Sequence, residues 1–361
     1  MDFAENWDKT KARFRGFWNG EIIDRCMAAA VAPRDNARFG DFPFPSDPEG
    51  RESWWLDAER VFERQFDRIE NTYYAGDAIP SISPDLGVAG HAGYFRGAGY
   101  AFGRDAIWFR PFIGGIGQGI GGLVFDRETP LFRKTAEHCK YFCERSKGRV
   151  AVAMPKASGN ADALAHALGS ENLLVAMLEE PEETASALEK MQSAWEAVFA
   201  EVNPVLLANN DGGGVIGWLN TWGGGWHGQM QADISVMMSG GLFREFILPE
   251  LKRQSALMDK PLYHLDGKEQ ARHLDALLSL ERLAAVQWTH VAGQPPPTEF
   301  IPELRRIQAA GKKLVIWVGD MRVFQGLLER LSSRGLLLGL YARDENEARS
   351  AVRLAERLTH E

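Results

Sequence analysis

Short runs of apolar and β-branched residues alternate along the chain with longer stretches in which apolar residues recur every three or four positions. The short runs predict buried β-strands, and the longer stretches predict amphipathic helices that connect them. Eight strands follow from this pattern, over residues 26–32, 78–83, 150–154, 215–219, 262–265, 284–288, 314–318 and 336–341. Because eight strand–helix units close a (β/α)8 barrel, the sequence predicts a TIM barrel of the α/β class.

Helical periodicity is clearest between the later strands. The predicted helices span residues 160–168, 182–208, 241–260, 270–280, 302–310, 321–332 and 344–358. Gly311 follows one predicted helix and Gly335 precedes the last strand, at positions where a left-handed residue ends a helix. The second half of the chain is therefore predicted to be a compact series of strand–helix units.

The segment 84–149 is rich in aromatic residues and glycine and is too long for an ordinary connection. We expect it to form an insertion or lid after the second strand, and residues 1–25 to form an N-terminal extension. No repeat or low-complexity linker divides the sequence, so we expect one barrel domain over residues 1–361 that contains this insertion.

Charge, apolar stretches and cysteine content indicate which classes of protein this chain can belong to. The chain has 41 basic and 49 acidic residues, a net charge of -8, and no long basic run, which disfavours a nucleic-acid partner. It has neither a signal-peptide pattern nor an apolar stretch of membrane-spanning length. The three cysteines, an odd and sparse number, suit a reducing compartment. We expect a cytoplasmic protein that does not enter membranes.

In barrels of this kind the active site lies at the carboxyl ends of the strands. Polar and aromatic residues that follow the predicted strands are therefore candidate site residues. They are Arg34, Arg38, Asp85, Lys156, Ser158, Asn220, Trp222, His264, Asp266, Gln287, His290 and Tyr341.

His264 and Asp266 form the sharpest candidate pair. Alternate residues of a strand point to the same side, so an imidazole and a carboxylate would enter the barrel mouth together. They could bind a metal ion or act as an acid/base pair. The alternative is a structural pair, in which a backbone carbonyl holds His264 and Asp266 caps the next helix.

Other motifs are less specific. Arg34 and Arg38 could grip a carboxylate or phosphate, or lie in a solvated loop. His138, Cys139 and Cys143 share one amphipathic helix, which argues against a zinc site. Residues 114–122 (GGIGQGIGG) do not follow a predicted strand, which argues against a dinucleotide fingerprint. The glycine-flanked residues Trp218, Trp222 and Trp226 could form an aromatic wall.

Four stretches carry a family resemblance: FRGFWNGEIIDR, ENLLVAMLEEPEET, QADISVMMSGGLFREFILPEL and YHLDGKEQARHLDALLSLERLAAVQW. Together they resemble the uroporphyrinogen decarboxylase superfamily, nearest to its bacterial members that are grouped with corrinoid-dependent methyltransferases. The resemblance covers nearly the whole chain and is most specific over residues 231–288. It implies a (β/α)8 barrel, in agreement with the strand count.

The superfamily implies two chemistries. Its decarboxylases carry an R-Q-A-G-R motif, of which this chain keeps the arginine spacing as Arg34 and Arg38, and an Asp for which Asp85 is the candidate. Its zinc-dependent thiol methyltransferases carry His-x-Cys after the fifth strand. His264 matches that histidine, Asp266 stands at the cysteine position, and no cysteine lies near Tyr341.

The leading prediction is therefore methyl transfer linked to a corrinoid, or demethylation of a small methylated compound. His264 and Asp266 would bind zinc or another divalent metal or act as an acid/base pair, Arg34 and Lys156 would hold an anionic substrate, and the segment around Trp222 would line the pocket. A corrinoid protein is a possible partner, and we expect a monomer or homodimer. The alternatives are a cofactor-free decarboxylase (a lyase) that uses Arg34, Arg38 and Asp85, and a ligand-binding barrel without catalysis.

Overall fold

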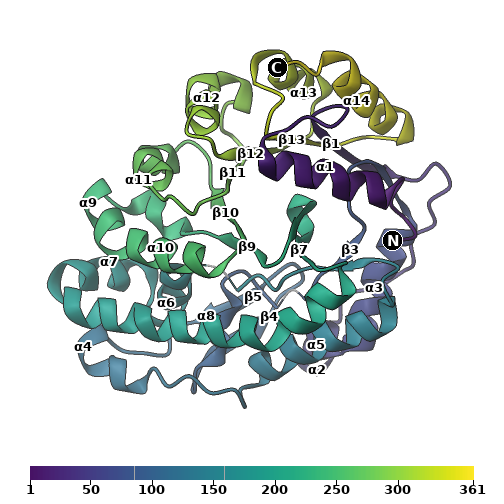
Figure 1. The fold of residues 1–361 in the computed structure, drawn as a ribbon. Helices are drawn as coiled ribbons and strands as arrows, with labels where there is room; N and C mark the ends of the chain where they lie inside the picture. The colour runs from purple at the N-terminus through teal and green to yellow at the C-terminus, as the bar shows by residue number, and fades with distance from the viewer. Residues whose placement is uncertain (85, 158) are drawn as a thin grey trace.

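The computed structural model describes residues 1–84, 86–157 and 159–361. Its central feature is a seven-stranded, mostly parallel sheet (Figure 1). Strand β2 pairs antiparallel with β1, and the other neighbours pair in parallel. The order is β2 (Thr72–Gly76), β1 (Met27–Pro33), β13 (Leu336–Tyr341), β12 (Lys313–Val318), β11 (Ala285–Trp288), β10 (Lys260–Leu265) and β9 (His227–Met230).

Three two-stranded ladders complete the strands of the described residues. β3 (Ser81–Ile82) pairs in parallel with β6 (Ala151–Val152), whereas β4 (Gly99–Phe102) with β5 (Ile107–Arg110) and β7 (Gly213–Ile216) with β8 (Thr221–Gly224) are antiparallel. All eight predicted strands occur; the last has its predicted bounds, and the other seven have shifted ends. The ladders of the described residues do not close into one sheet. The fold is thus α/β with a mostly parallel sheet.

Helices cover the sheet and connect its strands, as the hydrophobic periodicity predicts. Helix α6 has the predicted bounds, and the predicted helix 241–260 is interrupted by a π-helical turn over residues 243–247. The α-helices after β6 are α6 (Asn160–Leu168), α7 (Ser170–Glu179), α8 (Pro181–Asn209), α9 (Gly240–Leu242), α10 (Leu248–Leu257), α11 (Leu274–Leu278), α12 (Ile301–Ala309), α13 (Met321–Arg330) and α14 (Glu345–Leu358).

The N-terminal extension contains a helix that the sequence analysis did not predict. Helix α1 (Trp7–Asn19) begins where the Asn6 side chain accepts the N–H of Lys9, and it ends at Gly20 with φ 75°. The Gly20 carbonyl accepts from Arg334 at 3.5 Å, just before β13 begins. Helices α2 (Pro48–Leu56) and α3 (Ala58–Glu70) follow β1. α1 therefore lies at the end of the sheet where the strands begin.

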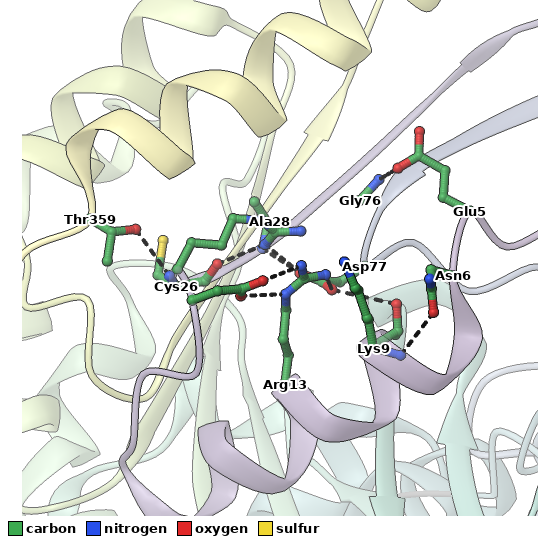
Figure 2. Close-up of polar contacts among 12 residues, drawn as sticks. Glu5, Asn6, Lys9, Arg13, Cys26, Ala28, Gly76, Asp77 and Thr359 are labelled. Carbon is green, nitrogen blue, oxygen red and sulfur yellow. Dashed lines mark hydrogen bonds and ion pairs between the residues drawn. The ribbon is translucent and has the colours of Figure 1, made fainter.

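A buried ion cluster joins α1 to the start of β1. Asp77 is completely buried and accepts from Arg25 at 2.5 Å, from Arg13 at 3.0 Å and from the Ala28 N–H at 3.0 Å. Figure 2 shows the Arg13 side chain and the Ala28 backbone converging on this carboxylate. Arg13 also forms an ion pair with Asp24 at 2.6 Å. Two guanidinium groups thus neutralise a carboxylate that burial would otherwise destabilise.

The segment 84–149 contains a hairpin and a long helix. The β4–β5 hairpin contacts α6 through the rings of Phe109 and His166, whose centroids are 5.0 Å apart. Helix α5 (Pro130–Ser146) packs against α3 and α8 and connects β3 to β6. Part of the predicted insertion is therefore an ordinary crossover helix, and a lid function for the remainder stays a prediction.

None of the helices in the described part of the chain combines the length and the apolar composition that crossing a bilayer requires.

Candidate functional site

His264 is the predicted residue around which a polar site forms. It stands near the end of β10, and Gln287 occupies the matching position of β11. His264 is 9% exposed, and its Nδ1 lies 2.5 Å from Gln287 Oε1 and 3.2 Å from Thr289 Oγ1. Gln287 Nε2 donates to Thr289, so its carbonyl oxygen faces the imidazole. Nδ1 then carries the proton of the neutral ring, and Nε2 is left as a proton acceptor.

Asp233 faces the other nitrogen of His264. It begins the short helical turn Asp233–Met237 just after β9. Its Oδ2 accepts from Gln231 Nε2 at 2.9 Å, and its Oδ1 lies 3.9 Å from His264 Nε2. Oδ1 is buried without a hydrogen-bond partner, although 40% of the side chain is exposed. This oxygen and Nε2 therefore face each other with unused hydrogen-bonding capacity.

A second carboxylate, Asp162, supports the turn that carries Asp233. It lies in the first turn of α6, is 8% exposed, and accepts the N–H groups of Asp233 at 2.9 Å and Ile234 at 2.8 Å. The Gln231 side chain hydrogen-bonds both carboxylates. Asp162 and Asp233 are thus parts of one polar unit.

Burial and like charge set the proton affinities in this unit. Burial raises the pKa of Asp233 to about 7, with a further rise from the charge of Asp266. Burial and the charge of Asp233 raise the pKa of Asp162 to about 7. Burial lowers the pKa of His264. Near neutral pH the site therefore has a neutral imidazole beside carboxyl groups that can hold or release a proton.

Asp266, the predicted partner of His264, is near this unit without bonding to the imidazole. It is half-buried, and its backbone N–H donates to Gln270 at 3.2 Å. Its charge raises the pKa of both His264 and Asp233. The proposed structural alternative was also wrong in detail, because a side-chain amide holds His264 and the Asp266 side chain does not cap the next helix.

Trp218 and two glutamines surround the same strand ends. The Trp218 ring lies edge-on to His264, with centroids 5.2 Å apart, and its Nε1 donates to Gln229 at 2.8 Å. Gln229 in turn donates to Gln231 at 2.5 Å. Trp218, Gln229 and Lys156 line a cavity of about 20 Å³, which has room for one water molecule. Lys156 is therefore placed beside this group, as predicted for a strand-end residue.

The described residues contain no group of three or more His, Cys, Asp or Glu side chains that could hold a metal ion. The two facing donors, His264 Nε2 and Asp233 Oδ1, are 3.9 Å apart. Ligands of tetrahedral zinc are roughly 3.4 Å apart, given bonds of about 2.1 Å. The donor set as it stands therefore does not fit a three-ligand metal centre.

Asn220 and Trp222 do not lie beside His264, where they were predicted as strand-end residues. β8 runs antiparallel to β7, so the chain turns back after Trp218 and carries Asn220 and Trp222 away from His264. Asn220 forms this turn with φ 51° and accepts the N–H of Ile79 at 2.8 Å. Trp222 is buried against Trp7 and Phe14 of α1. The prediction that Trp222 lines a pocket with His264 is therefore wrong.

The remaining tryptophan and histidine candidates are also dispersed. Trp226 stacks on Trp195 of α8, so the three tryptophans do not form one wall. The exposed His290 follows β11, and the exposed Tyr341 at the end of β13 packs against Trp317. His227 is a structural residue, bonded to the Lys260 carbonyl at 2.6 Å and Thr221 at 2.8 Å.

Arg34 and Arg38 lie beside the turn between α3 and β2. Arg34 Nε donates to the Glu70 carbonyl at 2.9 Å, and the backbone N–H of Arg38 donates to Asn71 at 2.6 Å. Three strands separate β1 from β10 in the sheet order, and no contact joins either described arginine to the His264 group. Asp85 and Ser158, the other two candidates, lie outside the described residues.

Comparison with known proteins bears on the fold. The sequence matches no protein-family model and no curated protein. Among solved structures, this chain is similar to a methyltransferase from Methanosarcina mazei, with a TM-score of 0.55 and 10% sequence identity. The match covers 96% of this chain and 98% of the other. At this identity the similarity concerns the fold alone, and it extends over nearly the full length of both chains.

Proposed function

We propose that this protein is an enzyme that transfers a methyl group to or from a heteroatom of a small molecule. The observation that carries the proposal is the Asp233–His264 pair, with a buried carboxylate oxygen 3.9 Å from a ring nitrogen at the carboxyl ends of adjacent parallel strands. The full-length similarity in fold to a protein described as a methyltransferase supports the choice of reaction. The sequence resemblance to the uroporphyrinogen decarboxylase superfamily points the same way.

The proposal includes a closed barrel. The Met154 N–H donates to the Val215 carbonyl at 2.8 Å, which connects the end of β6 to β7. Gly214 of β7 lies so close to β9 that a Cβ there would be 2.5 Å from the His227 carbonyl oxygen. These contacts bring the short ladder β3–β6 and strand β7 next to the edge of the seven-stranded sheet. A (β/α)8 arrangement would place all carboxyl ends around one mouth.

The pair would move the proton that accompanies methyl transfer. When a nucleophile X–H is methylated, the bond from the methyl carbon to its donor breaks, the C–X bond forms, and the proton on X goes to His264 Nε2 or to the Asp233 carboxylate. In demethylation the C–X bond would break as the methyl carbon bonds to a nucleophilic acceptor, and the protonated carboxyl group of Asp233 would donate its proton to the leaving heteroatom X. A pKa near the working pH suits both directions.

A corrinoid, on a partner protein, and a divalent metal stay predictions that rest on the resemblance. A methylated corrinoid would supply the methyl group. The described donors do not complete a metal site, so the chemistry assigned here uses proton transfer and positioning alone. Lys156 beside the Trp218 cavity is the candidate for an anionic part of the substrate. No described contact favours the decarboxylase alternative, because Arg34 binds the Glu70 carbonyl instead.

The proposal is tested by mixing the purified full chain with methylcobalamin and a panel of thiols and amines, and following the visible spectrum of the corrinoid. We expect turnover with the wild type and a loss of about 100-fold or more in Asp233→Asn and His264→Gln. His290→Gln is the matched control, because that histidine follows the next strand and is exposed. Equal turnover in all four proteins would overturn the assignment, and no turnover with any acceptor would remove methylcobalamin as donor.

Metal binding is tested separately by elemental analysis of the purified protein and of His264→Ala and Asp266→Ala after incubation with zinc, manganese and iron. From the geometry of the described residues we expect less than one metal ion per chain in the wild type. One ion per chain that disappears in both variants would instead establish the predicted metal site.

A further inference from the structure

We propose that Asp162 is the positioning residue of the site: it fixes the turn that points Asp233 Oδ1 at His264 Nε2. This inference rests on the proposed function, since it assigns a role within the same site. No sequence pattern singled Asp162 out, because it belongs to the helix that follows the third predicted strand and not to a strand end.

The geometry of the turn carries the proposal. Both oxygens of Asp162 are used, one by the N–H of Asp233 and one by the N–H of Ile234. A carboxylate that accepts two successive backbone N–H groups fixes the direction in which that peptide segment leaves β9. The Gln231 amide then connects the same carboxylate to Asp233 Oδ2. Oδ1 is the one Asp233 oxygen left to face His264.

The chain before α6 is adapted to this contact. Gly159 has φ 78°, and a Cβ there would lie 2.2 Å from Asp162 Oδ2 and 3.1 Å from the Gln231 side chain. A side chain at position 159 would therefore displace the carboxylate. The next residue, Asn160, is oriented into a buried hydrogen-bond network with His91, Gln192 and Glu250. The first turn of α6 thus carries both this network and the carboxylate that supports the Asp233 turn.

Asp162 also affects the site through its charge. An ionised carboxylate next to Asp233 opposes ionisation of Asp233, and it favours the protonated form of His264. Removing the charge should therefore lower the pKa of Asp233. A residue that only stabilised the fold would leave this titration unchanged.

The test is NMR titration of the full chain with labelled aspartate carboxyl groups and backbone amides. In the wild type we expect the Asp233 and Ile234 amide resonances to titrate together with the Asp162 carboxyl group that accepts them. In Asp162→Asn one N–H loses its acceptor, and the midpoint of Asp233 should move to lower pH because the negative charge next to it is gone. In a methyl-transfer assay kcat should fall by about 10- to 100-fold with little change in KM.

Glu250→Gln is the matched control, because Glu250 is also 8% exposed and accepts the Asn160 N–H in the same helical turn. It should leave the Asp233 titration in place. If Asp162→Asn does not fold, the wild-type titration alone decides: amides of Asp233 and Ile234 that do not respond when Asp162 titrates would overturn the proposal. This readout needs no turnover. The positioning role of Asp162 can therefore be overturned while methyl transfer is confirmed, and methyl transfer can be overturned while the positioning role is confirmed.

Discussion

Two aspartates with buried carboxylate oxygens show how differently this chain treats the same side chain. Asp77 lies at the end of the sheet where β1 begins. It is fully buried and is neutralised by Arg13 and Arg25. Asp233, at the opposite ends of the strands, has a second carboxylate, a neutral imidazole and a glutamine as neighbours. One of its oxygens is buried without a partner. The first arrangement neutralises a buried charge within the fold, and the second leaves a carboxylate oxygen without a partner, to which we assign proton transfer in the proposed function.

The largest expected effect is at Asp77. Asp77→Ala would leave two buried guanidinium groups without their shared partner, and should lower the free energy of unfolding by about 3–5 kcal/mol. Urea unfolding of wild type and variant measures the change. A decrease of less than about 1 kcal/mol would contradict the structural role.

The next largest effect is the pH dependence of stability that the buried carboxyl group of Glu250 causes. Burial raises the pKa of Glu250 to about 8. The folded chain therefore keeps this proton to higher pH than the unfolded chain does, so the contribution of Glu250 to stability is greatest at low pH and falls as pH rises from about 4.5 to about 8. Glu250→Gln should remove part of this loss and unfold at a higher temperature than wild type at pH 9. A melting temperature that falls equally with pH in both proteins would contradict the account.

Asp233→Asn should have a smaller effect on stability and of opposite sign to that of Asp77→Ala. The amide removes a carboxylate that burial and Asp266 disfavour, while its oxygen can still accept from Gln231. We expect a change in unfolding free energy between 0 and about +1 kcal/mol near pH 8, together with the loss of activity proposed above. Differential scanning calorimetry would show a destabilised protein if Asp233 were instead structural.

The smallest effect is expected at Asp24, whose ion pair with Arg13 is half-exposed. Asp24→Asn should change the unfolding free energy by about 0–1 kcal/mol, because Arg13 keeps its bond to Asp77. Comparison of Asp24→Asn with Asp77→Ala in the same urea experiment isolates the effect of burial. Equal losses in the two variants would show that burial does not distinguish these pairs.

The sequence predicted the strands better than the site. Apolar, β-branched runs mark the eight predicted strands, and His264 and Gln287 follow from two of them. β9 was missed, because His-Gly-Gln-Met is not a typical strand sequence. Without β9 the strand-end rule skipped Gln231 and Asp233, although the resemblance was most specific from residue 231 onward. The glycine-flanked β7–β8 turn likewise gave a false strand end at Asn220 and Trp222.

The role of Asp162 could not be predicted from spacing, since it depends on contact with Asp233 and Ile234, which come 71 and 72 positions later in the sequence. The buried ion cluster could not be predicted from spacing either, because it joins Arg13 of α1 to Asp77 across more than 60 residues. Local patterns predict local elements, whereas the pairing of charges depends on how those elements pack.

The most direct test is a carbon-13 titration of the Asp233 carboxyl group in the full chain, assigned with Asp233→Asn. The account predicts that this group titrates near neutral pH and that His264→Gln changes its midpoint, because the two side chains face each other. A carboxyl group that titrates near the ordinary value of 3.8 and ignores His264 would contradict the assignment of the Asp233–His264 pair as a proton-handling site.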